Sequence, residues 1–332
     1  MNAQYLIEHF LFFVNLLKTK SMNIVIYGTG GVGGYFGVRL AQFGQNVTFI
    51  ARGKHLEAIK QNGLELKSIN GNFTLKKVNV TNDVATISNP DLILITTKTW
   101  QLEEVAKSIQ PILTNNTSVI SLLNGADNAE KLIKILGTQH VLGGLCKIVS
   151  KIERFGVINH MAIEPYIAFG ELDNSHSTRI KEIKNVFDKA EIFNQVPDNI
   201  QVAIWSKFLF ITTISALGGL TRATLGEMRT QPEVRNLMLK TAQEIVTIAN
   251  AKGVPLNKES IEKVFHFIDK LPYETTASLQ RDIMEGRPSE LDSQVGTIHK
   301  MGQELNIPTP INSFIYHSLI ITEKRNRKES LS

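Results

Sequence analysis

Residues 24–35 read IVIYGTGGVGGY, an apolar run followed at once by a glycine-rich turn. Gly28, Gly30 and Gly33 have the spacing G-x-G-x-x-G, and the residues after them predict a helix. At such a strand–loop–helix junction the first glycine allows a tight turn, the second lets a pyrophosphate approach, and the third lets helix and strand pack closely. Free N–H groups at the helix N-terminus would bind the phosphates. The alternative is a glycine turn without a ligand. The predicted dinucleotide-binding residues of this loop are Gly28, Thr29, Gly30, Gly31, Val32 and Gly33.

The first half of the chain alternates between predicted strands and predicted helices. The run DLILITTK at 91–98 is continuously apolar before its polar end, as expected for a strand covered on both faces. Asn70-Gly71 predicts a hairpin between residues 64–68 and 73–80. Strand–helix alternation is typical of a doubly wound parallel sheet, so we predict an α/β fold. Further strands are expected at 23–27, 46–51, 118–124 and 140–145, and helices at 33–43, 55–62, 102–113 and 126–136.

The pattern changes after Lys147. Residues 150–172 predict extended, antiparallel pieces, residues 179–190 a helix, and nearly everything after residue 199 has helical periodicity. We therefore predict an N-terminal dinucleotide-binding domain at 22–195 and an all-helical domain at 196–332. The expected helices of the second domain are near 199–217, 232–252, 258–269, 274–285, 291–305 and 310–325.

Composition narrows the class of protein only modestly. The 332 residues are 42% hydrophobic and 20% charged, which is ordinary for a globular protein. The single cysteine, Cys146, excludes an internal disulfide and a cysteine-rich metal site, so we expect no metal and a reducing, cytoplasmic location. The net charge of +5 suits anionic small ligands without specifying one. We interpret the basic residues at 323–330 as a solvated helix end and expect no nucleic-acid partner.

The first 21 residues form an N-terminal extension. Tyr5–Leu17 is apolar but is interrupted by polar residues, and it is shorter than the roughly 20 residues of a membrane span. It lacks the basic leader and cleavage site of a signal peptide. Because Met22 directly precedes the first predicted strand, we interpret residues 1–21 as lying upstream of the natural start. The alternative is an amphipathic anchor; we expect no membrane partner.

The end of the second strand indicates which dinucleotide is bound. NAD sites usually place an acidic residue there, about 20 residues after the glycine loop, to bind the ribose hydroxyls. Here the sequence is FIARGKH, with Arg52 and Lys54 and no acid. An arginine at this point suits a 2′-phosphate, so the sequence predicts NADP(H). We interpret His55 as part of an exposed loop.

Polar residues that could act on a bound substrate follow two strands and interrupt one helix. Lys98 and Asn124 stand at the carboxyl ends of predicted strands, where ligands bind in open α/β sheets. Lys207 lies in the apolar helix IWSKFLF, where partial burial would lower its pKa and make it a plausible general acid. The alternative for Lys98 is an ordinary surface lysine, and the alternative for Asn124 is an ordinary Asn-Gly turn. For Lys207 it is a lysine that extends its charged end to the surface. Carboxylates that could pair with Lys207 are Asp282, Glu285 and Glu290.

These motifs, in their order along the chain, resemble one family. The glycine loop is followed by TTKTWQ, LLNG, IWSKFLF, SLQRDIMEGRPSELDSQVG and ELNIPTPIN, and together they resemble the ketopantoate reductases (2-dehydropantoate 2-reductases) over nearly all of 22–323. The resemblance implies an N-terminal Rossmann domain joined to an all-helical C-terminal domain, with the active site between them. It also implies that NADPH reduces the C2 carbonyl of 2-dehydropantoate to give (R)-pantoate, on the route to pantothenate and coenzyme A.

The resemblance also implies roles for individual residues. The family's general acid falls on Lys207, and the glutamate that binds the hydroxyl end of the substrate falls on Glu290. The serine that contacts the substrate carboxylate falls on Ser278. Lys98 and Asn124 fall on the lysine and asparagine of the cleft, where they would contact cofactor and substrate. Arg52 falls near the arginine that meets the 2′-phosphate.

Three positions depart from the family pattern. Asparagines that hold substrate in well-known members correspond here to Ile211, Ser215 and Thr275. Ser215 keeps a hydroxyl and is retained as a candidate substrate contact, whereas Ile211 cannot form a hydrogen bond. One alternative therefore keeps the reaction and changes the substrate to a more apolar 2-oxo acid. A second alternative, of a different class, is a non-catalytic NADP(H) sensor. We expect a small 2-oxo acid as partner, and the long C-terminal helices allow a homodimer.

Overall fold

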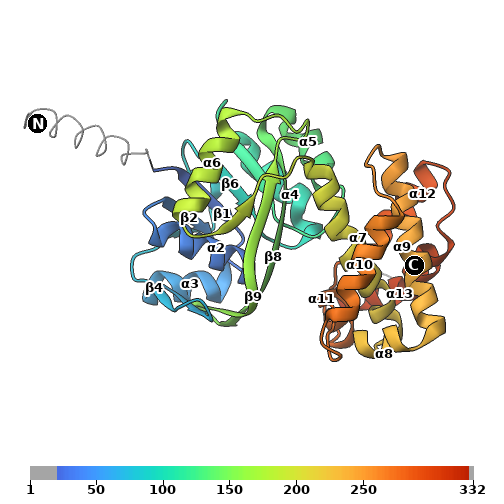
Figure 1. Cartoon of the computed structure of the whole chain (residues 1–332). Helices are drawn as coiled ribbons and strands as arrows, with labels where there is room; N and C mark the ends of the chain where they lie inside the picture. Colours follow the sequence, from blue (N-terminus) through green and yellow to red (C-terminus); the bar gives the residue numbers. More distant parts are fainter. Residues whose placement is uncertain (1–20, 329–332) are drawn as a thin grey trace, which may run out of the picture.

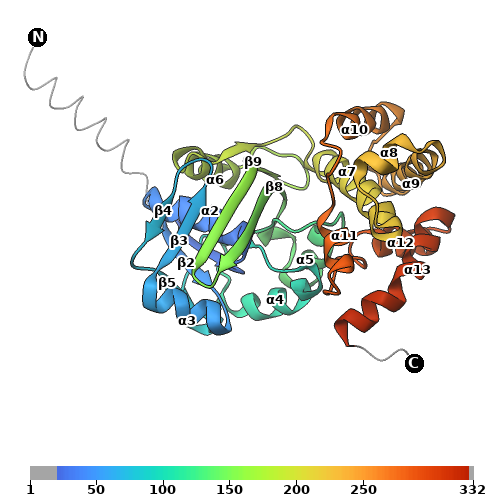
Figure 2. The ribbon, with the colours of Figure 1, turned by 90° about the horizontal axis from the view of Figure 1, so that it is seen from below.

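The computed structural model of the chain describes residues 21–328. The interpretation of the N-terminal extension falls, apart from Ser21, outside these residues. Within them the chain forms an α/β part followed by a cluster of helices, and the two lie side by side in Figures 1 and 2. The last strand ends at Gln195 and the first helix of the cluster begins at Ile200.

The α/β part is built on a ten-stranded sheet in the order β4-β3-β9-β8-β7-β6-β1-β2-β5, with β10 beside β9. Neighbours from β5 through β2, β1, β6 and β7 to β8 are parallel, which confirms the predicted parallel sheet. The strands are β1 (Asn23–Tyr27), β2 (Asn46–Ile50), β3 (Leu64–Ser68), β4 (Phe73–Leu75), β5 (Asn79–Thr81), β6 (Leu92–Ile95), β7 (Ser118–Ser121), β8 (Val141–Arg154), β9 (Val157–Gly170) and β10 (Phe193–Gln195).

Helices cover both faces of this sheet because the strands present apolar side chains on both faces. Ile24 and Ile26 of β1 pack with α2, α3 and α6, whereas Val25 and Tyr27 pack with α4 and α5. All four residues of β6 are buried, as the continuous apolar run predicts. The helices are α2 (Gly31–Gln42), α3 (Gly53–Asn62), α4 (Leu102–Ile109), α5 (Asn128–Leu136) and α6 (Thr178–Lys189).

Two strand predictions need correction. The hairpin at Asn70-Gly71 forms, but its second strand is only β4, because Asn79–Thr81 leave it to pair in parallel with β2. The strand expected at 140–145 continues to Arg154 and forms a long antiparallel hairpin with β9, as the pattern of 150–172 indicated. This hairpin reaches beyond the parallel sheet and packs against α2.

The helical part is organised around α7 (Ile200–Thr221), which is buried along most of its length. Its amino-terminal half packs on β8 and β9 through Ile200 and Ile204, and its remainder lies in the core of the other helices. By length and composition α7 could cross a membrane, but 61% of its most apolar window is buried in the protein, as in a core helix. The other helices are α8 (Leu225–Thr230), α9 (Pro232–Ala251), α10 (Lys258–Lys270), α11 (Ser278–Met284), α12 (Val295–Glu304) and α13 (Pro310–Arg327).

The predicted helices of this part are confirmed with some differences, one of which is that α7 ends at Thr221 and not near residue 217. The short helix α8, capped by Thr224 and Glu227, was not predicted, and α11 and α12 each begin four residues later than expected. The last helix is less solvated at its end than expected, because Glu323 is only 1% exposed and the Arg327 side chain 13%.

Candidate active site

The glycine loop joins β1 to α2 and has the geometry of a phosphate cradle. Gly28 has φ +106°, and the N–H groups of Gly28 and Thr29 donate to the carbonyl of Ile50 at the end of β2, at 3.3 and 3.1 Å. A Cβ added at Gly33 would lie 2.2 Å from the Gly28 carbonyl oxygen, so close packing of α2 requires glycine there. A Cβ at Gly30 would meet nothing within 4 Å. The loop is thus tight on its protein side and open where a ligand would approach.

The amino end of α2 leaves donors for that ligand. The residue before the helix, Gly30, has no side chain that could accept a hydrogen bond from the first amide groups, and the first turn carries no acidic residue. The amide groups of the first turn have no intrahelical partners, and the helix dipole favours negative charge at this end. Gly31 and Val32 begin this turn, so the predicted loop residues fit a dinucleotide diphosphate.

Arg52 lies next to this loop. It follows β2, two residues after Ile50, whose carbonyl accepts the loop's hydrogen bonds. Its side chain is 57% exposed and lies 3.6 Å from a carboxylate oxygen of Glu104. An exposed ion pair of this kind contributes little, so Arg52 is free to exchange it for a ligand phosphate. Lys54, also exposed, is the second base beside the loop.

His55 is buried, and its interpretation as part of an exposed loop is wrong. It lies in the first turn of α3, with Nε2 2.8 Å from the Thr29 carbonyl and Nδ1 accepting the Gly156 N–H at 3.1 Å. The ring therefore links the glycine loop to the tip of the β8–β9 hairpin. Burial lowers the pKa of His55, although the bond to Thr29 opposes this, so the neutral ring that both contacts require is favoured. The partners are distant in sequence, and no local pattern around His55 reveals them.

Lys207 lies on the face of α7 that meets the sheet. Its side chain borders a cavity of about 10 Å³, room for about one water, together with Asn124 and Gly125 from the loop after β7. Burial lowers the pKa of the Lys207 ammonium, while the nearby negative charge of Glu290 acts in the opposite direction. The remaining lining residues of this cavity are Leu123, Gly144, Leu145, Ile204, Phe208 and Ile211.

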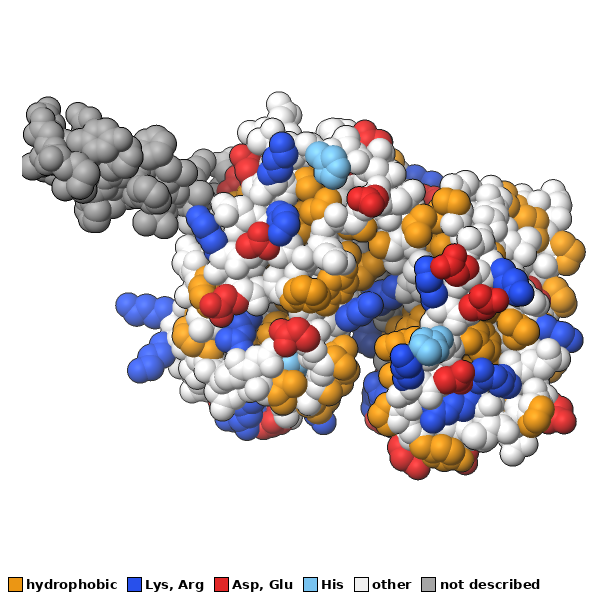
Figure 3. All heavy atoms as spheres, in the orientation of Figure 1, with side chains coloured by type: hydrophobic (Ala, Val, Ile, Leu, Met, Phe, Trp, Pro, Cys, Tyr) orange, Lys and Arg blue, Asp and Glu red, His pale blue; other side chains and the backbone are white. Residues whose placement is uncertain are grey.

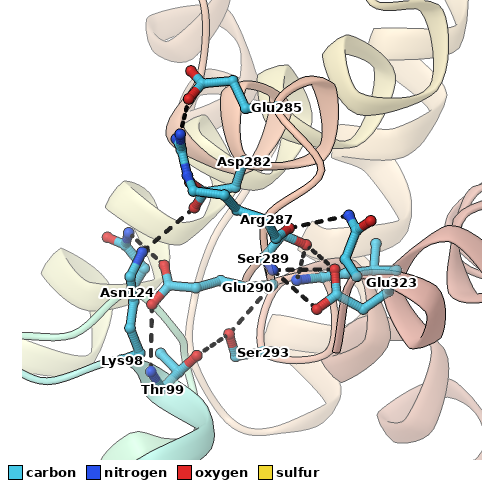
Figure 4. Close-up of polar contacts among 12 residues, drawn as sticks. Lys98, Thr99, Asn124, Asp282, Glu285, Arg287, Ser289, Glu290, Ser293 and Glu323 are labelled. Carbon is cyan, nitrogen blue, oxygen red and sulfur yellow. Dashed lines mark hydrogen bonds and ion pairs between the residues drawn. The ribbon is translucent and has the colours of Figure 1, made fainter. Parts of the chain in front are cut away.

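Glu290 brings the helical part to the same place. It is 8% exposed, and it accepts hydrogen bonds from Asn124 Nδ2 at 3.1 Å and from the Thr99 backbone N–H at 3.4 Å (Figure 4). Ser293 adds a hydroxyl contact to Thr99 at 2.7 Å. Residues after β6, after β7 and before α12 therefore converge at the boundary between the two parts. Figure 3 shows this boundary as a hollow into which basic side chains extend.

Lys98 points to a different carboxylate. Its Nζ lies 3.4 Å from Asp282 Oδ2, and Arg287 donates two hydrogen bonds to the other oxygen, at 3.0 and 2.8 Å. Asp282 therefore belongs to Lys98 and Arg287 and does not pair with Lys207. Glu285 forms an ion pair with Arg287. Of the three candidate partners for Lys207, only Glu290 lies in its electrostatic neighbourhood.

Three other candidates lie further from this centre. Ser278 begins α11 and is half-buried, as is Thr275 in the preceding loop. Ser215 lies two turns beyond Lys207 on α7, is fully buried, and its hydroxyl has no hydrogen-bond partner among the described residues. None of the three lines the cavity at Lys207. The structure thus brings together Lys207, Asn124 and Glu290, with Lys98 at the rim.

The fold and these groups define a dinucleotide-binding oxidoreductase. A phosphate cradle ends the first strand, and a lysine whose pKa is lowered stands beside an amide and a carboxylate at the carboxyl edge of the same sheet. The chain belongs to the ketopantoate reductase family. Residues 24–174 match the family model described as "Ketopantoate reductase PanE/ApbA", and residues 199–323 match its C-terminal counterpart.

Individual relatives agree with this assignment at modest identity. The chain is 29% identical over 304 residues to the uncharacterized oxidoreductase YkpB of Bacillus subtilis, covering 91% of this chain and 99% of that one. It is also 29% identical over 313 residues to a 2-dehydropantoate 2-reductase of Nostoc sp., covering 92% and 97%. The crystal structure of a PanE/ApbA family ketopantoate reductase from Ralstonia eutropha matches with a TM-score of 0.84 and 26% identity, covering 92% of this chain and 100% of that one.

Proposed function

We propose that this protein catalyses the NADPH-dependent reduction of 2-dehydropantoate to (R)-pantoate, a step of pantothenate and coenzyme A biosynthesis. The observation that carries the proposal is the position of Lys207, whose ammonium shares a cavity with Asn124 and lies near Glu290 where the two parts of the chain meet. The sequence of the Nostoc relative, a 2-dehydropantoate 2-reductase, supports the choice of substrate.

Lys207 is the general acid of this proposal. Bound NADPH supplies the hydride that reduces the C2 carbonyl. As negative charge develops on the carbonyl oxygen, the Lys207 ammonium stabilises it and then donates a proton to it. Burial lowers the pKa of Lys207, so its proton is easier to give than that of a solvated lysine. Asn124 is placed to orient the same substrate.

Glu290 and Lys98 hold the two ends of the substrate site. The Glu290 carboxylate is an acceptor for the hydroxyl of 2-dehydropantoate, and its charge favours the protonated form of Lys207. Lys98, half exposed at the rim, offers a positive charge to the cofactor or to the substrate carboxylate. Ser278 and Ser215 do not line the cavity at Lys207. Their role as substrate contacts stays a proposal.

NADPH is the proposed cofactor because of the residues after β2. Arg52 and Lys54 stand next to the glycine loop, and no acid occupies the position that would bind the 2′-hydroxyl of NADH. A planar guanidinium matches the geometry of phosphate oxygens. The exposed pair with Glu104 is the only ion pair of Arg52 among the described residues, and it does not hold the side chain away from solvent.

A second candidate substrate is a more apolar 2-oxo acid. The walls around Lys207 are formed by Leu123, Leu145, Ile204, Phe208 and Ile211, and Asn124 is the only uncharged polar side chain in the lining. Polar groups that a substrate hydroxyl could bind are therefore sparse at this wall. A site with few hydrogen-bonding groups discriminates weakly in favour of hydroxylated substrates.

The test is NADPH oxidation at 340 nm with three 2-oxo acids: 2-dehydropantoate, 4-methyl-2-oxopentanoate and phenylglyoxylate. The proposal expects the highest kcat/KM with 2-dehydropantoate. A higher value with either apolar acid would transfer the assignment to the second candidate. Tight NADPH binding without oxidation by any of the three would indicate a sensor and would overturn both.

A further inference from the structure

The segment that carries Glu290 is held by the last turn of α13. Ser289, directly before Glu290, is fully buried, and its N–H donates to both carboxylate oxygens of Glu323, at 2.9 and 3.1 Å. The Ser289 hydroxyl donates to the same carboxylate at 2.5 Å (Figure 4). Both the backbone and the side chain of Ser289 therefore donate hydrogen bonds to one buried carboxylate from a helix distant in sequence.

Arg327 completes the arrangement one turn later on α13. Its Nε donates to Glu323 Oε1 at 2.6 Å, and its Nη2 donates to the Ser289 carbonyl at 2.7 Å. The guanidinium thus neutralises the buried carboxylate and binds the backbone that the carboxylate also holds. An arginine is well suited to both contacts at once, because its donors diverge in a fixed plane.

The same guanidinium reaches the α/β part. Its centre lies 4.3 Å from the ring centroid of Trp100, which follows Lys98 and Thr99 after β6. Thr99 is the residue whose N–H meets Glu290. One side chain therefore contacts, at once, the segment before Glu290 and the segment that Glu290 binds across the boundary.

We propose that Glu323 and Arg327 are positioning residues that fix the backbone at Ser289 so that the Glu290 carboxylate faces Asn124 and Thr99. The proposal rests on the proposed function, in which Glu290 binds the substrate. Neither side chain of α13 lines the cavity at Lys207, whereas Arg327 borders the larger pocket of about 260 Å³ on the other side of Glu290. Their path to the cavity at Lys207 therefore leads through Glu290. A loose Ser289 would let the Glu290 carboxylate leave the position that a substrate hydroxyl needs.

The experiment is a double-mutant cycle between Arg327→Ala and Glu290→Ala, with Arg325→Ala as the matched control. Arg325 lies on the same turn but is exposed. Substrate KM and kcat are measured with the 2-oxo acid of the three that gives the highest kcat/KM, and the NADPH Kd is measured by fluorescence. We expect Arg327→Ala to raise KM by about tenfold to a hundredfold, as for other misplaced groups, with the NADPH Kd unchanged. Arg325→Ala should change neither.

The double variant separates positioning from simple stabilisation. If Arg327 acts through Glu290, its removal in the Glu290→Ala protein raises KM by less than about twofold, because coupled residues are not additive. An equal increase in both backgrounds, or no increase in wild type, would overturn the inference. If Glu290→Ala itself leaves KM unchanged, the proposed function's assignment of Glu290 fails instead. Arg327→Lys, which keeps the charge, gives an intermediate KM and serves if Arg327→Ala is unstable at the assay temperature.

Discussion

At the scale of single residues, the side chains proposed to bind substrate and cofactor are few, and each has an identifiable neighbour. The negative charge of Glu290 acts on Lys207. Lys98 forms an ion pair with Asp282, and Arg52 forms one with Glu104. Glu290 is buried, and removing one member of a buried charged network costs more than removing an exposed one. Of these groups, Arg52 is thus the one whose replacement should leave the fold unchanged.

Arg52→Ala should weaken NADPH binding by about tenfold to a hundredfold, the value of a charge-assisted hydrogen bond, and should change NADH binding much less. The reason is that Arg52 is proposed to meet only the 2′-phosphate. Fluorescence titrations with both nucleotides measure the two Kd values. Glu104→Gln, which removes the negative charge that pairs with Arg52, is the matched control and should not weaken NADPH binding. An equal loss of both nucleotides would refute the role of Arg52.

A local pattern in the sequence marked the positions of three of these residues, and their roles stay predictions. Lys98 and Asn124 follow strands, and Lys207 is conspicuous in an apolar helix, so their types and positions were enough. The pairing of Asp282 with Lys98 could not be predicted, because residues 98 and 282 meet only through the packing of two separate parts. The same holds for Glu323 and Arg327, which looked like part of a basic, solvated tail.

At the scale of elements, the junction of β1 and α2 explains why its glycines are not interchangeable. Gly33 is required by the packing of α2, whereas Gly30 is open on the ligand side. Local spacing predicted this junction correctly because strand, turn and helix are contiguous. It failed for β5, whose partner β2 lies some thirty residues earlier. The capping pair Thr224 and Glu227 was the signal by which α8 could have been found.

Two alanine substitutions in the loop should therefore affect different properties, one the stability of the fold and the other NADPH binding. Gly33→Ala should lower the melting temperature, at a cost of about 1–3 kcal/mol for overpacking. Gly30→Ala should leave the melting temperature of the free protein nearly unchanged but should weaken NADPH binding, because the new methyl group enters the space proposed for the diphosphate. Thermal unfolding with and without NADPH measures both effects. A Gly30→Ala protein that binds NADPH like wild type would show that the ligand does not approach there.

The contact between α3, the glycine loop and the β8–β9 hairpin should make stability depend on pH. Burial lowers the pKa of His55 below its ordinary value of 6.5, so below that pH the unfolded chain takes up a proton that the folded chain does not. The stabilisation is therefore complete above pH 6.5 and decreases as the pH falls toward the pKa of the folded state. Melting temperatures of wild type and His55→Gln from about pH 7 to about pH 5 test this. The slope should be smaller in His55→Gln and unchanged in His176→Gln, which alters an exposed histidine; equal slopes in all three would contradict it.

At the scale of the whole molecule, we predict that the two parts must separate for a substrate to reach Lys207. The cavity there has room for about one water, far less than a 2-oxo acid needs. Contacts such as Thr99 with Ser293 and Asn124 with Glu290 hold the parts together in this structure. Closure of this kind excludes water from the reaction and opening releases product. The sequence indicated two parts but not how closely they meet.

A cross-link across the boundary tests this requirement. The hydroxyls of Thr99 and Ser293 lie 2.7 Å apart, so Thr99→Cys combined with Ser293→Cys should form a disulfide on oxidation. The only native cysteine, Cys146, is buried. We expect the oxidised double variant to lose NADPH oxidation and to regain it with dithiothreitol, while each single variant is insensitive to the oxidant. Full activity of the cross-linked protein would mean that the substrate enters without separation of the parts.

Lys207 is, in the proposed function, the residue that donates the proton in an NADPH-linked reduction. The most direct measurement is kcat for NADPH oxidation by Lys207→Ala with 2-dehydropantoate, beside the NADPH Kd of the same protein and an exposed-lysine control, Lys240→Ala. Loss of a general acid should lower kcat by about 10²–10⁴-fold, with the NADPH Kd and the control close to wild type. Turnover of Lys207→Ala at the wild-type rate would contradict the account.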